Sequence, residues 1–95
     1  MAGAITVKFY GLLRRQVRAQ AIKIVADRLP LLELLLRAQE QAGKDFLGEL
    51  LDPEKKLLAG TMILVNGENI RLKQDLETRV RGGDSVDLFS PAGGG

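Results

Sequence analysis

The chain has 95 residues, which is enough for one folded domain around a single hydrophobic core. With 45% apolar and 27% charged residues and a formal net charge of +2, its composition is that of a globular protein and excludes a largely disordered chain. The longest uninterrupted apolar run, Met62 to Val65, is far too short to span a bilayer, and no targeting pattern opens the chain, so we expect a cytoplasmic protein without a membrane partner.

The first predicted elements are two strands joined by a basic connection. From Ile5 to Phe9 apolar and polar residues alternate, which indicates a strand with one face in the core and puts Tyr10 on the opposite face. Residues 20–25 repeat the alternation, while residues 11–19 are read as an irregular connection. We therefore expect an antiparallel hairpin at the amino-terminal end.

The one long helix is predicted from Pro30 to Ala42. Asp27 lies upstream as a possible capping side chain, and Gly43 is placed to end the helix. Leu32 and Leu36 widen its apolar face; we expect them to cover the sheet and the following segment, with a partner groove as the weaker alternative. The apolar residues at helical spacing are Leu31, Leu34, Leu35, Ala38 and Ala42.

The second half of the chain is predicted to return to strands. Residues 45–51 suit a short helical turn and residues 54–59 a charged connection. Residues 61–65 form a strand pattern with apolar side chains at both odd and even positions, and therefore on both faces, so this strand should lie inside the sheet. Asn66-Gly67 is a strong signal for a tight turn, and a short strand should follow at residues 69–72.

The last part of the chain completes the predicted order of elements. Leu76 and Val80 indicate a helical turn or a tight loop anchored on the core, and residues 82–84 form a turn before the final strand at 85–89. The order strand, strand, helix, strand, short strand, strand predicts an α+β domain. In it one main helix packs across one face of a mixed sheet of four to five strands.

Two aromatic side chains are predicted to meet on the uncovered face of that sheet. If the first and last strands are neighbours, Tyr10 lies beside Phe89, close to where the chain leaves the sheet. Exposed aromatics beside a tail would form a docking patch. The alternative is that they are scattered surface residues without a role.

The chain lacks the residues on which most enzymes rely. It contains no Cys and no His, so it has neither a thiolate nucleophile nor the usual general base. Its acidic residues show no spacing typical of a metal site or a catalytic pair. We expect no metal and no enzyme acting alone; if the chain carries chemistry, the first candidate is the α-carboxylate of Gly95.

Basic residues gather at two places in the sequence. Solvated loops are the first interpretation, and docking to an acidic partner is the second. A nucleic-acid surface is not expected, because aromatic residues for base stacking are missing around these positions. The two groups are Arg14, Arg15 and Arg18, and Arg71, Lys73, Arg79 and Arg81.

The last residues form a glycine-rich tail, expected to be extended and flexible from residue 90 to 95. Pro91 cannot donate to a sheet ladder and marks the end of pairing, and Gly93 and Gly94 lack Cβ atoms. Such a tail can thread a narrow slot and reach roughly 20 Å from Phe89. An unstructured leftover is the alternative.

These pieces together resemble the ubiquitin-like sulfur carriers, the family of the molybdopterin synthase small subunit and the thiamine-pathway sulfur carrier protein. The resemblance covers nearly the whole chain and implies a ubiquitin-like β-grasp domain at residues 1–89. The matching segments, besides the leucine-rich helix, are Val7-Lys8-Phe9-Tyr10, Ile63-Leu64-Val65-Asn66-Gly67-Glu68, Gly82-Gly83-Asp84-Ser85-Val86 and Phe89-Ser90-Pro91-Ala92-Gly93-Gly94-Gly95.

The resemblance also implies a function for the tail. Gly95, next to Gly94 in the double-glycine motif, would be adenylated by a partner resembling ubiquitin-activating enzymes, which uses ATP, and would then become a thiocarboxylate that donates sulfur. Tyr10, Ile70 and Phe89 would bind partners. Those partners would be the activating enzyme, a sulfur donor protein and the molybdopterin synthase large subunit or an equivalent acceptor. The free chain should be a monomer and bind no cofactor itself.

Three interpretations of the family resemblance stay open. The first is a sulfur carrier of the molybdenum or tungsten pterin branch. The extra length at residues 44–60 favours this branch, or a relative of the archaeal modifiers, over the thiamine branch. The second is a protein modifier, in which a lysine amine attacks the same activated terminus. The third is an interaction domain whose glycines are inert. Gly93 stands where relatives often carry a side chain, so this tail should be more mobile than usual.

Overall fold

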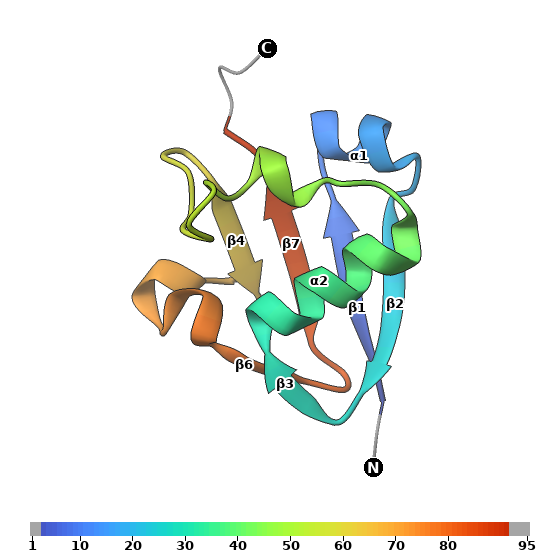
Figure 1. The fold of residues 1–95 in the computed structure, drawn as a ribbon. Coiled ribbons are helices and arrows are strands. Elements are labelled where there is room, and N and C mark those ends of the chain that lie inside the picture. The colour runs from blue at the N-terminus through green and yellow to red at the C-terminus, as the bar shows by residue number, and fades with distance from the viewer. Residues whose placement is uncertain (1–2, 92–95) are drawn as a thin grey trace.

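The computed structural model describes residues 3–91, which form a mixed sheet with helices on one side (Figure 1). The main sheet has five strands, in agreement with the predicted four to five. In spatial order they are β2 (Ala21–Ala26), β1 (Gly3–Phe9), β7 (Ser85–Phe89), β4 (Met62–Val65) and β5 (Glu68–Asn69).

The first and last strands are neighbours in the interior of this sheet. β1 pairs antiparallel with β2, which confirms the predicted hairpin, and parallel with β7, which confirms that the first and last strands are neighbours. Phe9 lies opposite Leu88, and both side chains are fully buried. β4 pairs with β7 on one side and β5 on the other, so its predicted interior position is correct.

The long helix α2 (Leu31–Ala42) crosses one face of the sheet, as Figure 1 shows. Gly43 ends it with φ of 69°, a left-handed conformation that glycine adopts without a Cβ penalty. The predicted cap is wrong, because Pro30 occupies the cap position and no side chain caps the helix, so Asp27 does not act there. Leu32 packs partly against the core, while Leu36 remains 41% exposed.

The segment between α2 and β4 is anchored in the core rather than lying on the surface. Phe46 is fully buried and packs edge-on against Phe9, with ring centroids 5.1 Å apart. The predicted helical turn is present as η1 (Leu47–Glu49). Thr61 Oγ1 donates a hydrogen bond of 2.9 Å to the carbonyl oxygen of Leu50, which ties the segment to the start of β4.

Several elements were not predicted. The expected basic connection contains a short helix, α1 (Leu12–Val17), which buries Leu13 and Val17. After β5 the chain turns into η2 (Ile70–Leu72), so the strand predicted at residues 69–72 is only two residues long. The helical turn that was one of the two predictions between Leu72 and Arg81 is present as η3 (Asp75–Glu77). A second, two-stranded sheet pairs β3 (Arg28–Pro30) with β6 (Arg79–Arg81). None of the helices described has the length and hydropathy needed to cross a bilayer.

We predict that Gly82→Ala destabilises the domain, because a Cβ atom at this position would lie 2.5 Å from the backbone nitrogen of Gly3. The strand end would have to move away, at a cost of about 1–3 kcal/mol in the free energy of unfolding. Chemical denaturation of the variant and the wild type measures this difference in the free energy of unfolding. Gly48→Ala is the matched control, since its Cβ atom would meet nothing within 4 Å. Equal stability of the two variants would contradict the close approach.

Candidate functional site

The aromatic pair predicted at the base of the tail is present. Because β1 and β7 run parallel and Phe9 pairs with Leu88, Tyr10 and Phe89 lie next to each other at the carboxyl ends of the two strands. Their rings stack with centroids 4.5 Å apart and an interplanar angle of 10°. Phe89 is the last residue of β7, so the stacked rings lie directly before the tail. The geometry that the prediction required is confirmed, and the partner-binding role of the pair stays a prediction.

Polar contacts hold the Tyr10 ring in this position. The Tyr10 hydroxyl donates a hydrogen bond of 3.0 Å to Oδ1 of Asp87. The Arg14 guanidinium lies 5.7 Å from the ring centroid, within the range of a cation–π contact, and its Nε donates to the carbonyl oxygen of Phe9 at 3.3 Å. The hydrogen bond to Asp87, with some desolvation and the nearby carboxylate charge, raises the pKa of Tyr10, while Arg14 opposes the rise.

Met62 extends the exposed apolar surface beside the two rings. It lies directly opposite Phe89 in the pairing of β4 with β7, so both side chains share one face of the sheet, and it is 37% exposed. We call Tyr10, Phe89 and Met62 the aromatic patch. The sequence analysis missed Met62, because only the register of β4 with β7 shows that Met62 lies on the same face of the sheet as Phe89.

Ile70 does not belong to this surface. Its side chain is fully buried, because the chain turns into η2 after β5 and directs Ile70 into the core. The prediction that Ile70 binds a partner is therefore wrong for the folded domain. Leu72, two residues later, is instead 86% exposed.

The structure describes the first two tail residues, Ser90 and Pro91, whereas the predicted functional residues Gly93, Gly94 and Gly95 lie outside the described residues. Pro91 rests against the turn that precedes β4. A methyl group added to Gly60 would lie 3.2 Å from Cβ of Pro91, and Gly60 has φ of 90°. The Gly60 turn is therefore the support on which the base of the tail rests.

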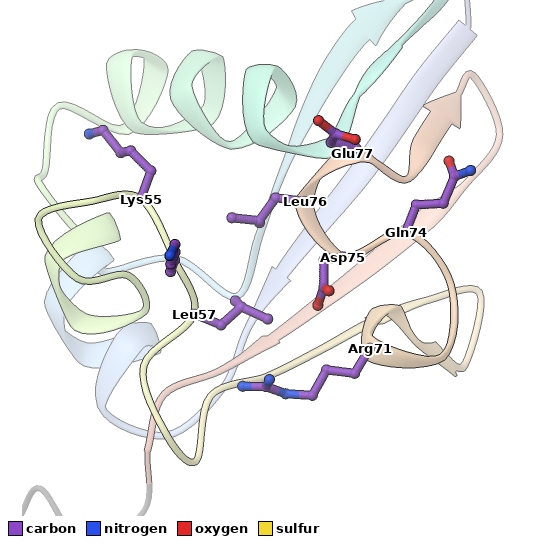
Figure 2. Close-up of a pocket in the computed structure, with 8 residues that line it drawn as sticks. Lys55, Leu57, Arg71, Gln74, Asp75, Leu76 and Glu77 are labelled. Atoms are coloured by element: carbon purple, nitrogen blue, oxygen red, sulfur yellow. The ribbon is translucent and has the colours of Figure 1, made fainter.

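A hollow of about 490 Å³ lies on the other side of the loop that carries this support. Figure 2 shows Leu57 and Leu76 on opposite sides of it, with Arg71 along its lower edge. Arg71 Nη2 donates to the carbonyl oxygen of Leu58 at 3.4 Å, which braces the loop. The hollow is lined by neither aromatic ring nor Pro91, and residues 3–91 contain no group of acidic residues that could hold a metal ion.

The mixed five-stranded sheet with one main helix across it is the fold of the ubiquitin-like β-grasp proteins. Within that class, the family model of the ThiS family matches residues 7–95, and the chain belongs to this family. It is accordingly a carrier-type protein and not an enzyme itself.

Relatives agree with this assignment. A protein of Archaeoglobus fulgidus named as a sulfur carrier is 35% identical over 74 residues, which cover 78% of this chain and 83% of the relative. The small archaeal modifier protein 1 of Methanosarcina acetivorans has the same fold, with a TM-score of 0.76, 22% identity and coverage of 100% and 99% of the two chains. The matching chain of the BexX/CysO complex of Amycolatopsis orientalis has a TM-score of 0.75 and 25% identity, with coverage of 97% and 100%.

We predict that Tyr10 titrates above its ordinary pKa, because ionisation breaks its hydrogen bond to Asp87 and places two negative charges side by side. The chain has one tyrosine and no tryptophan, so tyrosinate absorbance reports this group alone. Asp87→Asn should lower the pKa, whereas the distant Asp45→Asn should leave it unchanged. A wild-type titration at the ordinary value, or equal effects of the two variants, would refute the contact.

We also predict that Gly60→Ala moves the base of the tail. Gly60→Ala and Gly67→Ala both place a side chain at a φ near 90°, so both should lose about 1–2 kcal/mol of stability. Only at Gly60 does the new methyl group meet Pro91. NMR resonances of Ser90 and Pro91 should therefore shift in the first variant and stay in place in the second. Unmoved resonances in Gly60→Ala would show that Pro91 does not rest on this turn.

Proposed function

We propose that this chain is a sulfur carrier that works through the carboxylate of Gly95. The observation that carries the proposal is the construction of the tail's base. The last strand lies in the centre of the sheet, its final aromatic residue is stacked, and Pro91 is supported by Gly60. These contacts fix the point and direction at which the chain leaves the body. Family membership and the sulfur-carrier name of the Archaeoglobus fulgidus relative support the same conclusion.

The chemistry requires an activating partner, because a carboxylate has no good leaving group. In the proposed reaction an oxygen of the Gly95 carboxylate attacks the α-phosphorus of ATP in the partner's site, and pyrophosphate leaves. Hydrosulfide delivered by a donor protein then attacks the acyl carbon, the acyl–oxygen bond breaks, AMP leaves, and the sulfur loses its proton to solvent. The product is a thiocarboxylate at Gly95. A slender tail brings the reacting atom into a closed nucleotide site that the folded body cannot enter.

The aromatic patch is the proposed docking surface for the activating enzyme. Tyr10, Phe89 and Met62 are partly exposed apolar side chains at the base of the tail, and aromatic anchors of this kind often dominate binding energy. A partner bound there would hold the tail at the mouth of its active site. We place the encounter in the cytoplasm and take the free chain to be a monomer.

We propose that the sulfur acceptor is the large subunit of a pterin synthase of the molybdenum or tungsten branch. The segment 44–60, whose length favours this branch, supports the tail through Gly60 and is anchored by Phe46. The second candidate is a protein modifier, favoured by the full-length match to the small archaeal modifier protein. A lysine amine would then displace AMP in place of sulfur and form an isopeptide bond.

We predict that Gly94→Ala slows adenylation by roughly tenfold or more, because a side chain next to the reacting carboxylate clashes in a narrow slot and displaces the acyl group. ATP–pyrophosphate exchange with the cognate activating enzyme measures the rate. Gly93→Ala is the matched control: it adds the same methyl group one residue further from the carboxylate, and its rate should stay close to that of the wild type. Folding of both variants should be intact, so equal exchange rates for Gly94→Ala and the wild type would count against the proposed site.

A further inference from the structure

The end of the molecule opposite the tail carries a ribbon of arginines. β3 and β6 form this ribbon at the start of β7, whereas the tail leaves from the end of β7 (Figure 1). Their pairing places Arg28 directly opposite Arg81, and Arg79 lies on the same exposed side of β6. The sequence already grouped Arg79 and Arg81 with other basic residues, but it could not add Arg28, which is about fifty residues away from them.

This arrangement places like charges side by side, which opposes the folded state. Like charges directly opposite each other on neighbouring strands repel, and Val80 and Leu29 alone provide the buried contacts of the ribbon. Within residues 3–91 no carboxylate forms an ion pair with Arg28, Arg79 or Arg81. The three guanidinium groups are therefore available to a ligand.

The arginines surround a hollow of about 280 Å³, which Lys73 also lines. Two carboxylates lie in the same lining, but both already have partners. Glu68 forms an ion pair of 3.4 Å with Lys73, and Asp84 accepts hydrogen bonds at both of its oxygens. The hollow consequently keeps an excess of positive charge.

Hydrogen bonds between two turns hold the wall of this hollow in place. Asp84 accepts from Asn66 Nδ2 at 3.0 Å and from the backbone nitrogen of Arg81 at 2.9 Å. Asn66 in turn accepts from the backbone nitrogen of Ser85 at 2.9 Å. The backbone and polar wall of the hollow is thus already formed, and binding would have to order only the exposed arginine side chains.

We propose that this hollow and its ribbon, the basic pole, bind the carboxylate side chains of an acidic segment on a partner protein. Planar guanidinium groups match carboxylates in both charge and shape. A nucleic acid fits less well, because no aromatic residue lines the hollow for stacking and Glu68 and Asp84 would repel a continuous phosphate backbone.

The basic pole adds to the proposed sulfur-carrier function without depending on it. Because the basic pole lies at the start of β7 and the aromatic patch at its end, a partner bound at the basic pole leaves the aromatic patch uncovered (Figure 1). One protein can thus hold the carrier while another acts on its terminus. Binding of a partner at the basic pole would not depend on the chemistry at Gly95.

The test is an NMR titration of the ¹⁵N-labelled full chain with a blocked peptide of alternating Glu and Gly. The Gln-Gly peptide of equal length is the neutral control, and inorganic phosphate and a single-stranded RNA are separate arms. We expect the acidic peptide to shift the resonances of Arg28, Arg79 and Arg81. R79Q/R81Q should weaken binding roughly fivefold. R15Q/R18Q removes the same charge elsewhere and should leave binding unchanged.

Other outcomes would overturn the proposal. Equal losses in the two double variants would show attraction by net charge alone. Shifts with phosphate or RNA but not with the peptide would show a different ligand class, and the absence of any shift at the basic pole would show no site. The backbone spectra of the variants verify that each is folded, so a loss of binding reports the missing guanidinium groups.

Discussion

The parallel pairing of β1 with β7 is the constraint on which the site depends. It places the last strand in the centre of the sheet, between the first strand and β4, where hydrogen bonds on both sides hold it. In the same register it brings Tyr10 next to Phe89. One backbone arrangement thus fixes the exit point of the tail and builds an aromatic surface around that point. A terminal strand at the edge of a sheet would fray and could do neither.

The segment 44–60 gives the body its second support for the tail. Phe46 anchors the segment against Phe9 in the core, and the turn at Gly60 meets Pro91. Two features favour glycine there, since φ is 90° and a side chain would press against the proline, with its Cβ atom 3.2 Å from Cβ of Pro91. The first two tail residues, Ser90 and Pro91, are therefore held at the body by this turn.

The sequence allowed the main elements to be predicted because their signals are local. Alternation in residues 5–9 and 85–89, helical spacing in α2, and the Asn66-Gly67 turn each depend on a few neighbouring residues. The β3–β6 sheet could not be predicted in this way, since three-residue strands carry no periodicity and their partners are far apart in the chain. Ile70 was misplaced because a strand pattern was extended past the point where η2 turns the chain inward. The support from Gly60 depends on a contact across the fold and had no sequence signal.

The central claim is that the reactive atom is the terminal acyl carbon of Gly95, presented by a body without catalytic groups. Intact-mass spectrometry of the full chain, after incubation with ATP, a sulfide source and the cognate activating enzyme, tests it most directly. We expect a mass gain equal to the replacement of one oxygen by one sulfur, located at Gly95 by fragmentation. An unchanged mass, or sulfur located on any other residue, would contradict it.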